Sequence, residues 1–147
     1  MIIVTTDHGR GENGHGHGGQ SERERTTWIS TNVPVNHFKA GGLAITDIAP
    51  SICRYMGFEV PQAVLWEQDG MPFIGKTDIY DLQTLPYDNR VELSWKSYSG
   101  NVPVTVYAAT DNKFKEGGKD EWIKVAELPA GATEYTVDLQ TLPSSKF

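Results

Sequence analysis

The pattern of hydrophobic and polar positions along the chain changes near residue 76. Before that point, short apolar runs alternate with polar loops and one segment of helical spacing, which is typical of an α/β arrangement. After it, apolar and polar residues alternate with a period of two in short stretches separated by turns, which indicates antiparallel strands. We therefore expect two parts in this chain of 147 residues, residues 1–76 and residues 77–147.

The apolar runs of the first part predict two strands. Ile2–Thr5 is short, apolar and β-branched, which is typical of a strand buried on both faces of a parallel sheet. Thr26–Thr31, with the sequence TTWIST, has the β-branched and aromatic residues that favour a second strand.

A helix is predicted over residues 47–57. Thr46 and Asp47 offer an N-cap, Pro50 falls in the first turn where its missing N–H costs little, and Gly57 is a candidate stop. Between these signals the apolar residues recur at helical spacing, at Ile48, Ile52, Tyr55 and Met56.

The second part is predicted to be an antiparallel β-sandwich of at least four strands. The alternating stretches are Arg90–Lys96, Val102–Ala108, Glu121–Leu128 and Glu134–Leu139. The hexamer DLQTLP occurs at Asp81–Pro86 and again at Asp138–Pro143, with unlike flanks. We interpret it as coincidence or as shared strand-to-turn chemistry, not as a repeat architecture.

Composition narrows the class of protein. An apolar content of 38% and a charged content of 22% are typical of a soluble globular protein. The net charge of -6 argues against duplex nucleic-acid binding, which needs clustered Lys and Arg. The single Cys53 excludes an intrachain disulfide and a Cys-based zinc finger. We expect no membrane span and see no signal-peptide pattern in these residues.

The candidate chemistry lies in residues 4–19, VTTDHGRGENGHGHGG, which hold three of the four histidines. Asp7 and His8 stand at the end of a predicted strand, where α/β sheets place ligands. His15 and His17 follow in a glycine-rich loop that can fold over the same point. Such nitrogen and oxygen donors suit Zn²⁺ and tolerate Mn²⁺. A flexible metal-scavenging tract is the competing interpretation, and His37 is expected to be an ordinary histidine.

Three ordered motifs resemble a known family. They are a strand ending in TDHG, the loop HGGQSERER, and DIAPS at Asp47–Ser51 followed by Tyr55–Gly57. Together they look like the C-terminal part of the alkaline phosphatase superfamily, and within it the phosphodiesterase, nucleotide pyrophosphatase and sulfatase-like branches. The resemblance covers roughly residues 1–75 and implies an α/β fold.

This resemblance implies a hydrolase of phosphate or sulfate esters with two divalent metal ions, most simply Zn²⁺. By the family pattern, Asp7 and His8 bind one metal and His17 binds the other, with His15 as the alternative to His17. The DIAPS helix is a structural element of the family. The resemblance also implies a periplasmic, secreted or cell-surface location.

The chain departs from the family pattern in what it lacks. Family members carry a Ser or Thr nucleophile, a metal-binding Asp and an Asp-x-x-x-His, all N-terminal to the Asp-His-Gly. Only six residues precede Asp7, and Thr5 and Thr6 belong to the predicted strand itself. We expect the chain alone to be inactive, with no catalytic residue of its own. We also expect a sheet without these segments to expose apolar faces, which favours a homo-oligomer or domain swapping.

The second part resembles a fibronectin type III or related immunoglobulin-like module. VELSWKS looks like its B strand with a buried Trp95, VTVYAATD like its C strand and EWIKVAEL like its C′ strand. The 71 residues from 77 to 147 are fewer than the usual seven-strand set needs, so we expect an incomplete sandwich.

Two further functions stay open beside the hydrolase. The chain is alternatively a non-enzymatic module that binds carbohydrate or protein, or a histidine-rich metal buffer. Arg10, Arg23 and Arg25 are candidates for contacts with an anionic substrate, although SERER is also typical of a solvated segment. Trp66 and Trp122 are expected to be buried in a strand or between domains, with ligand stacking as the alternative.

Overall fold

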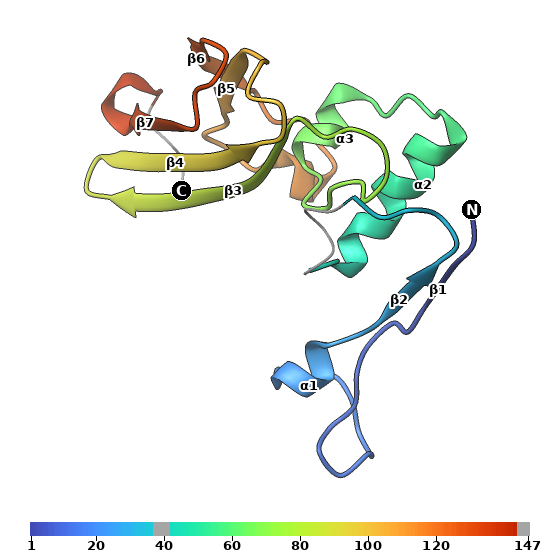
Figure 1. The fold of residues 1–147 in the computed structure, drawn as a ribbon. Coiled ribbons are helices and arrows are strands. Elements are labelled where there is room, and N and C mark those ends of the chain that lie inside the picture. Colours follow the sequence, from blue (N-terminus) through green and yellow to red (C-terminus); the bar gives the residue numbers. More distant parts are fainter. Residues whose placement is uncertain (37–41, 144–147) are drawn as a thin grey trace. The chain divides into compact units, whose positions relative to one another are not determined.

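The structure is a computed structural model that describes residues 1–36 and 42–143 (Figure 1). The chain is rich in β-strands and has few helices. Its contacts divide it into two compact units. Unit 1 consists of Met1–Pro61 and Gln68–Lys76, and unit 2 consists of Gln62–Glu67 and Thr77–Phe147. The main division falls between Lys76 and Thr77, but a short segment before it, Gln62–Glu67, belongs to unit 2.

Unit 1 contains the short strands β1 (Ile3–Thr5) and β2 (Ile29–Thr31). They pair antiparallel, with Ile3 opposite Thr31. The expected parallel strand buried on both faces is therefore wrong for the described residues, and Val4 is 50% exposed. An apolar run has the capacity for burial, but it becomes buried only where layers cover both faces of its sheet. A two-stranded ribbon supplies no such layers.

The predicted helix is confirmed as α2 (Ile48–Met56), preceded by a 3-10 turn, η2 (Ile45–Asp47). Gly57 ends the helix with φ of 70°, a left-handed conformation that glycine adopts without strain. The apolar side chains of the predicted stripe nevertheless face outward. Ile52, Tyr55 and Met56 are 42%, 52% and 58% exposed.

A buried polar clamp holds the start of α2. The carboxylate of Asp47, 1% exposed, accepts the backbone N–H of Ala44 at 2.8 Å and that of Met71 at 2.7 Å. The hydroxyl of Ser51 donates to the carbonyl of Asp47 at 2.6 Å and accepts the N–H of Phe73 at 2.9 Å. Phe73 is fully buried. The Asp and Ser of DIAPS therefore fix the segment that contains Met71 and Phe73.

Unit 2 contains two antiparallel sheets (Figure 1). One has the strand order β3-β4-β7 and the other pairs β5 with β6. Their bounds are Ile79–Tyr87 for β3, Arg90–Ser97 for β4, Val104–Ala108 for β5, Ile123–Leu128 for β6 and Glu134–Asp138 for β7. The unit also holds helix α3 (Gln62–Trp66) and two 3-10 turns, η3 (Lys113–Glu116) and η4 (Leu139–Thr141). All four predicted strands are confirmed, and β3 is an additional strand.

The core of unit 2 takes side chains from both sheets. Trp95 of β4, Val106 of β5 and Val137 of β7 are each at most 7% exposed. The indole N–H of Trp95 donates to the carbonyl of Ala132 at 2.9 Å, so the largest core side chain has its polar atom satisfied. The alternation that predicted β4 thus places Trp95 inside, as expected.

A bulge in β3 lies opposite Trp95. Tyr80 pairs with Lys96 and Gln83 pairs with Ser94, so two residues, Asp81 and Leu82, face one residue of β4. Asp81 takes a positive φ of 56°. Its carboxylate binds the ammonium of Lys96 at 2.6 Å, which fixes this unusual backbone position.

In the described residues, no helix has the length and apolar character that crossing a membrane requires.

Candidate metal centre

The histidine loop runs from β1 to helix α1 (Glu22–Arg25) and returns to β2. Within it, Gly14, Gly16 and Gly18 have φ of 72°, 81° and 89°. Gly16 separates His15 from His17, and Gly14 and Gly18 flank the pair, so left-handed positions alternate with the two histidines. The glycines of the HGHG stretch therefore give the loop a specific path, which brings its end back toward its beginning.

His8 meets two other predicted ligands. Its ring stacks on that of His17, with centroids 4.6 Å apart and an interplanar angle of 23°. Its Nε2 lies 3.6 Å from Oδ1 of Asp7. The structure thus brings His8 against His17 and close to its sequence neighbour Asp7.

The backbone selects the tautomer of His8. Its Nδ1 lies 2.6 Å from the carbonyl oxygen of Gly9, and because a carbonyl only accepts, Nδ1 carries the proton. In the neutral tautomer with its proton on Nδ1, Nε2 is the unprotonated nitrogen, which is the form that ligates metals. The side chain of His8 is 34% exposed and that of Asp7 is 86% exposed, so both are accessible to an ion.

Of the two other histidines, His15 alone lies among the described residues. His15 is exposed, and its backbone N–H donates to Oδ1 of Asn13 at 3.0 Å. His37 lies outside the described residues. Of the two histidines considered for the second metal, His17 is the one whose ring contacts His8.

The donor set fits zinc in its chemistry, since two imidazoles and a carboxylate are ordinary zinc ligands. The structure shows two separate pairs, His8 with Asp7 and His8 with His17, and no closed set of ligands around one point. Among residues 1–36 and 42–143, no three His, Cys, Asp or Glu side chains form a group that could hold a metal ion.

Helix α1 anchors the loop, and Glu24 is its central residue. The hydroxyl of Ser21 and the backbone N–H of Gly19 bind its carboxylate, and together with the nearby His17 they lower the pKa of Glu24. The sequence reasoning missed Glu24 as a functional candidate. The signal was present, because Ser21 and Glu24 have the Ser-x-x-Glu spacing of a capping box.

The arginines that were considered for anion contacts have a mixed environment. Arg10 and Arg23 border a hollow of about 620 Å³, but the carboxylate-bearing Glu12 and Glu22 border it as well. Arg23 also donates to the carbonyl of Glu12 at 3.3 Å. The arrangement gives Arg23 a structural contact within the loop.

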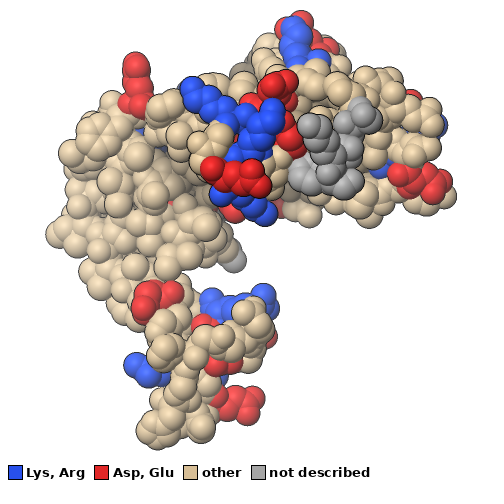
Figure 2. Space-filling view, turned by 180° about the vertical axis from the view of Figure 1, so that it is seen from behind, with Lys and Arg blue, Asp and Glu red and all other residues tan. Residues whose placement is uncertain are grey.

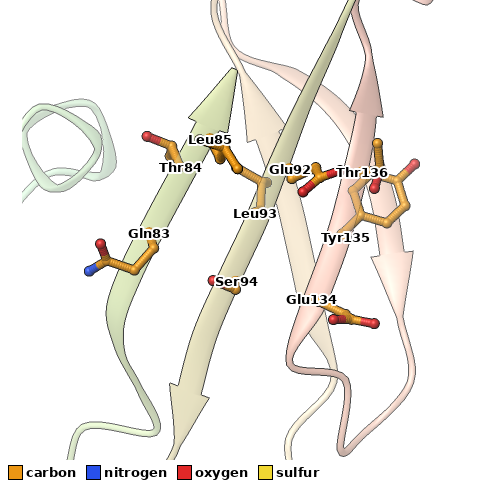
Figure 3. Close-up of a pocket in the computed structure, with 9 residues that line it drawn as sticks. All are labelled: Gln83, Thr84, Leu85, Glu92, Leu93, Ser94, Glu134, Tyr135 and Thr136. Atoms are coloured by element: carbon orange, nitrogen blue, oxygen red, sulfur yellow. The ribbon is translucent and has the colours of Figure 1, made fainter. Parts of the chain in front are cut away.

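Unit 2 carries two surface features of its own. A hollow of about 710 Å³ lies on the three-stranded sheet, lined by residues such as Leu85, Glu92 and Tyr135 (Figure 3). Separately, the ring of Trp66 from α3 lies 5.3 Å from Tyr107 and 5.2 Å from Trp122. Both tryptophans are half-buried by these mutual contacts, which agrees with packing and not with a free ligand platform.

No protein-family model matches this chain, and neither a curated protein nor a solved structure is similar enough to count as a match.

Proposed function

We propose that this chain is the metal-binding segment of a hydrolase that cleaves phosphoric or sulfuric esters, of the alkaline phosphatase superfamily type. The observation that carries the proposal is the stacking of the His8 ring on the His17 ring. The carboxylate of Asp7 also lies near Nε2 of His8. Residues nine positions apart in a glycine-rich loop have no structural need to stack two imidazoles at an exposed site. A pair of metal ions bound side by side would give that arrangement a purpose.

The proposed ligand assignment follows the pairs. Asp7 and His8 hold one divalent ion and His17 holds part of the neighbouring site, with Zn²⁺ as the first candidate and Mn²⁺ as the second. When bound, such a pair of ions would supply charge stabilisation to the attacking and leaving oxygens of the ester reaction. The protein's own contribution is the Nδ1–H bond from His8 to Gly9, which orients Nε2 toward the metal.

The same proposal assigns no nucleophile to these residues. A Ser or Thr would attack the ester, and none in this sequence stands in the required context. We therefore propose that the 147 residues bind metal but do not turn over substrate by themselves. Unit 2 would act as an accessory fibronectin type III-like module. Its two sheets, with the orders β3-β4-β7 and β5-β6, support that part of the proposal. We also propose an extracytoplasmic location, which only the family resemblance implies.

Zinc titration of the whole chain tests the metal site. Calorimetry with Zn²⁺ should detect binding that Asp7→Ala, His8→Ala and His17→Ala each weaken at least about tenfold, because each removes one ligand. His15→Ala is the matched control and should leave the affinity unchanged. Equal losses at all four positions would instead indicate a non-specific histidine tract and would overturn the proposal.

An assay with chromogenic phosphodiester and sulfate-ester substrates tests the second half of the proposal. The chain loaded with Zn²⁺ or Mn²⁺ should show no turnover above that of the free metal. Metal-dependent hydrolysis that disappears in Asp7→Ala would show that these residues contain a nucleophile after all.

A binding role is the second candidate function, and the surface of β3 favours it. Leu82, Leu85 and Tyr87 are 59%, 61% and 68% exposed, and Leu85 borders the hollow on the sheet. Glycan-array screening of the whole chain beside a Leu85→Asp variant tests this candidate. Binding that the variant loses would support it, and the absence of binding to any glycan would leave unit 2 without a carbohydrate role.

A further inference from the structure

Glu24 connects the two ends of the histidine loop. Its backbone carbonyl accepts the N–H of Gly9 at 2.8 Å, and its side-chain Oε1 accepts the N–H of Gly19 at 3.1 Å. Gly9 directly follows His8, and Gly19 lies two residues after His17. One residue is therefore bonded to both of the segments that carry the stacked imidazoles.

The carboxylate of Glu24 is itself held in one orientation. Oε2 accepts the hydroxyl of Ser21 at 2.6 Å, and the same hydroxyl oxygen accepts the backbone N–H of Glu24 at 3.3 Å. Ser21 is the N-cap of α1, so the Glu24 side chain is held in a fixed position relative to the helix backbone. With both oxygens engaged, the position of Gly19 is tied to that of α1.

A side chain at Gly9 would clash with backbone, and one at Gly19 would displace the carboxylate of Glu24. A Cβ on Gly9 would lie 2.0 Å from the carbonyl oxygen of Arg23, and a Cβ on Gly19 would lie 2.4 Å from Oε2 of Glu24. The loop is thus seated against α1 at both ends. The guanidinium of Arg23 adds a third tie at the carbonyl of Glu12.

We propose that Glu24 is the positioning residue of the metal centre. Its carboxylate holds the end of the loop so that His17 lies against His8, and it contributes to metal affinity without ligating the metal. This inference rests on the proposed metal site for its function, but the positioning itself is a property of the metal-free chain. A loop with three left-handed glycines has a large conformational entropy. An anchor at its end reduces the entropy that must be lost when metal binding orders the loop.

The first test uses the metal-free chain. NMR should show nuclear Overhauser contacts between the ring protons of His8 and His17, and slow exchange of the Gly19 amide proton. Glu24→Ala should abolish both signals. Glu24→Gln should retain them, because the amide oxygen still accepts the Gly19 N–H. Ring contacts that persist in Glu24→Ala would overturn the positioning role, whatever the chain does with zinc.

The second test measures Zn²⁺ affinity for the same variants. Glu24→Ala should lower it about 10- to 100-fold, as loss of a residue that orients a ligand does, and Glu24→Gln should stay within about threefold. Glu22→Gln on the same short helix is the control and should leave it unchanged. An unchanged affinity in Glu24→Ala would contradict the inference. If Asp7→Ala leaves zinc binding intact, the proposed function fails instead, and the NMR result still decides the role of Glu24.

A third variant covers the case in which Glu24→Ala unfolds α1. Gly19→Ala keeps the carboxylate but displaces it, because the new methyl group occupies the space of the Glu24 side-chain oxygens. It should reproduce the loss of the His8–His17 contact with α1 intact. Gly42→Ala, where a Cβ meets nothing within 4 Å, is its control. A Gly19→Ala chain with its ring contact unchanged would refute the inference.

Discussion

Units 1 and 2 are held together by different kinds of interaction. In unit 1 a buried carboxylate and a buried hydroxyl, Asp47 and Ser51, fix the segments around α2 through backbone N–H and C=O groups. In unit 2 two strand ladders enclose the apolar side chains of Trp95, Val106 and Val137. Unit 2 therefore depends mainly on apolar burial, whereas unit 1 depends on directional polar contacts around one buried aromatic residue, Phe73.

Both units leave large apolar side chains exposed, such as Leu85 and Tyr87 in unit 2. Unit 1 leaves a cluster of large apolar side chains exposed on and beside α2, namely Ile45, Ile52, Tyr55, Met56 and Phe58. Figure 2 shows a broad area without charged side chains on the part of unit 1 that carries this helix. An amphipathic helix shows its apolar face in this way when nothing covers it. A hydrophobic stripe thus predicts a helix well, but its side chains are buried only if another element covers them.

The largest effect that separates the units is expected from Trp95→Ala. Removing this core side chain should lower the free energy of unfolding of unit 2 by about 3 to 5 kcal/mol, through lost transfer energy and a residual cavity. Denaturant titration with amide exchange of β4 and α2 as local reporters measures it. Tyr87→Ala, at a residue that is 68% exposed, is the control and should change stability by less than about 0.5 kcal/mol. An equal loss of protection in α2 would show that the two units do not unfold independently.

A smaller effect, confined to unit 1, is expected from Asp47→Ala. The substitution leaves the backbone N–H groups of Ala44 and Met71 without their acceptor and should cost about 2 to 4 kcal/mol. The Met71 amide should lose its protection from hydrogen exchange. Asp69→Ala, at an exposed carboxylate nearby in sequence, is the control. If Asp47→Ala leaves the Met71 amide protected, the polar clamp does not hold unit 1. The claim that unit 1 depends on directional polar contacts is then wrong.

The smallest effect is a pH dependence in unit 2. The Lys96 ammonium, through its hydrogen bond and its charge, lowers the pKa of Asp81 below its ordinary value of 3.8. A lowered pKa in the folded state gives stability that is present above the ordinary value and is lost as the pH falls through the folded value. Unit 2 should therefore lose stability in acid below about pH 4.

The variant Asp81→Asn should reduce this acid-dependent loss while leaving the behaviour of α2 unchanged. Urea unfolding at a series of pH values between 2 and 6 provides the measurement, with the exposed Asp88→Asn as a comparison, since Asp88 also has a positive φ, of 49°. Since the Asp81 and Lys96 side chains are 41% and 64% exposed, the effect should be modest. Identical acid profiles for the parent and Asp81→Asn would show that the Asp81–Lys96 ion pair does not contribute to the stability of unit 2.

The sequence predicted some elements well for identifiable reasons. Helix α2 has a first-turn proline and a glycine stop, although Asp47 makes no side-chain capping bond to it, and β4, β5 and β7 have clean alternation. Strand β3 escaped notice because its bulge at Asp81 and Leu82 shifts the alternation, and Pro86 argues against an ordinary strand. The burial expected of Ile2–Thr5 failed because period and composition describe one strand and not the layers on either side of it.

The hexamer DLQTLP separates local from tertiary causes directly. Its first copy lies within β3, where Asp81 forms an ion pair with Lys96. In its second copy, Asp138 ends β7 and its Oδ1 accepts the N–H of Gln140 as the cap of the 3-10 turn η4. Identical residues thus form a bulged strand in one place and a turn in the other, because strand pairing and ion partners come from elsewhere in the chain.

In the candidate metal centre, too, some features follow from the local sequence and others from the tertiary structure. The sequence by itself determined which candidate donor side chains are available, the glycine-rich loop that makes their approach feasible, and the helix and strand segments with strong local signals. Only the tertiary structure decided that His17 and not His15 contacts His8, and that Glu24 anchors the loop to α1. The reason is physical. Residue type and spacing limit which side chains can reach one another, but several loop paths satisfy those limits, and long-range hydrogen bonds such as that from Gly9 to Glu24 select one of them.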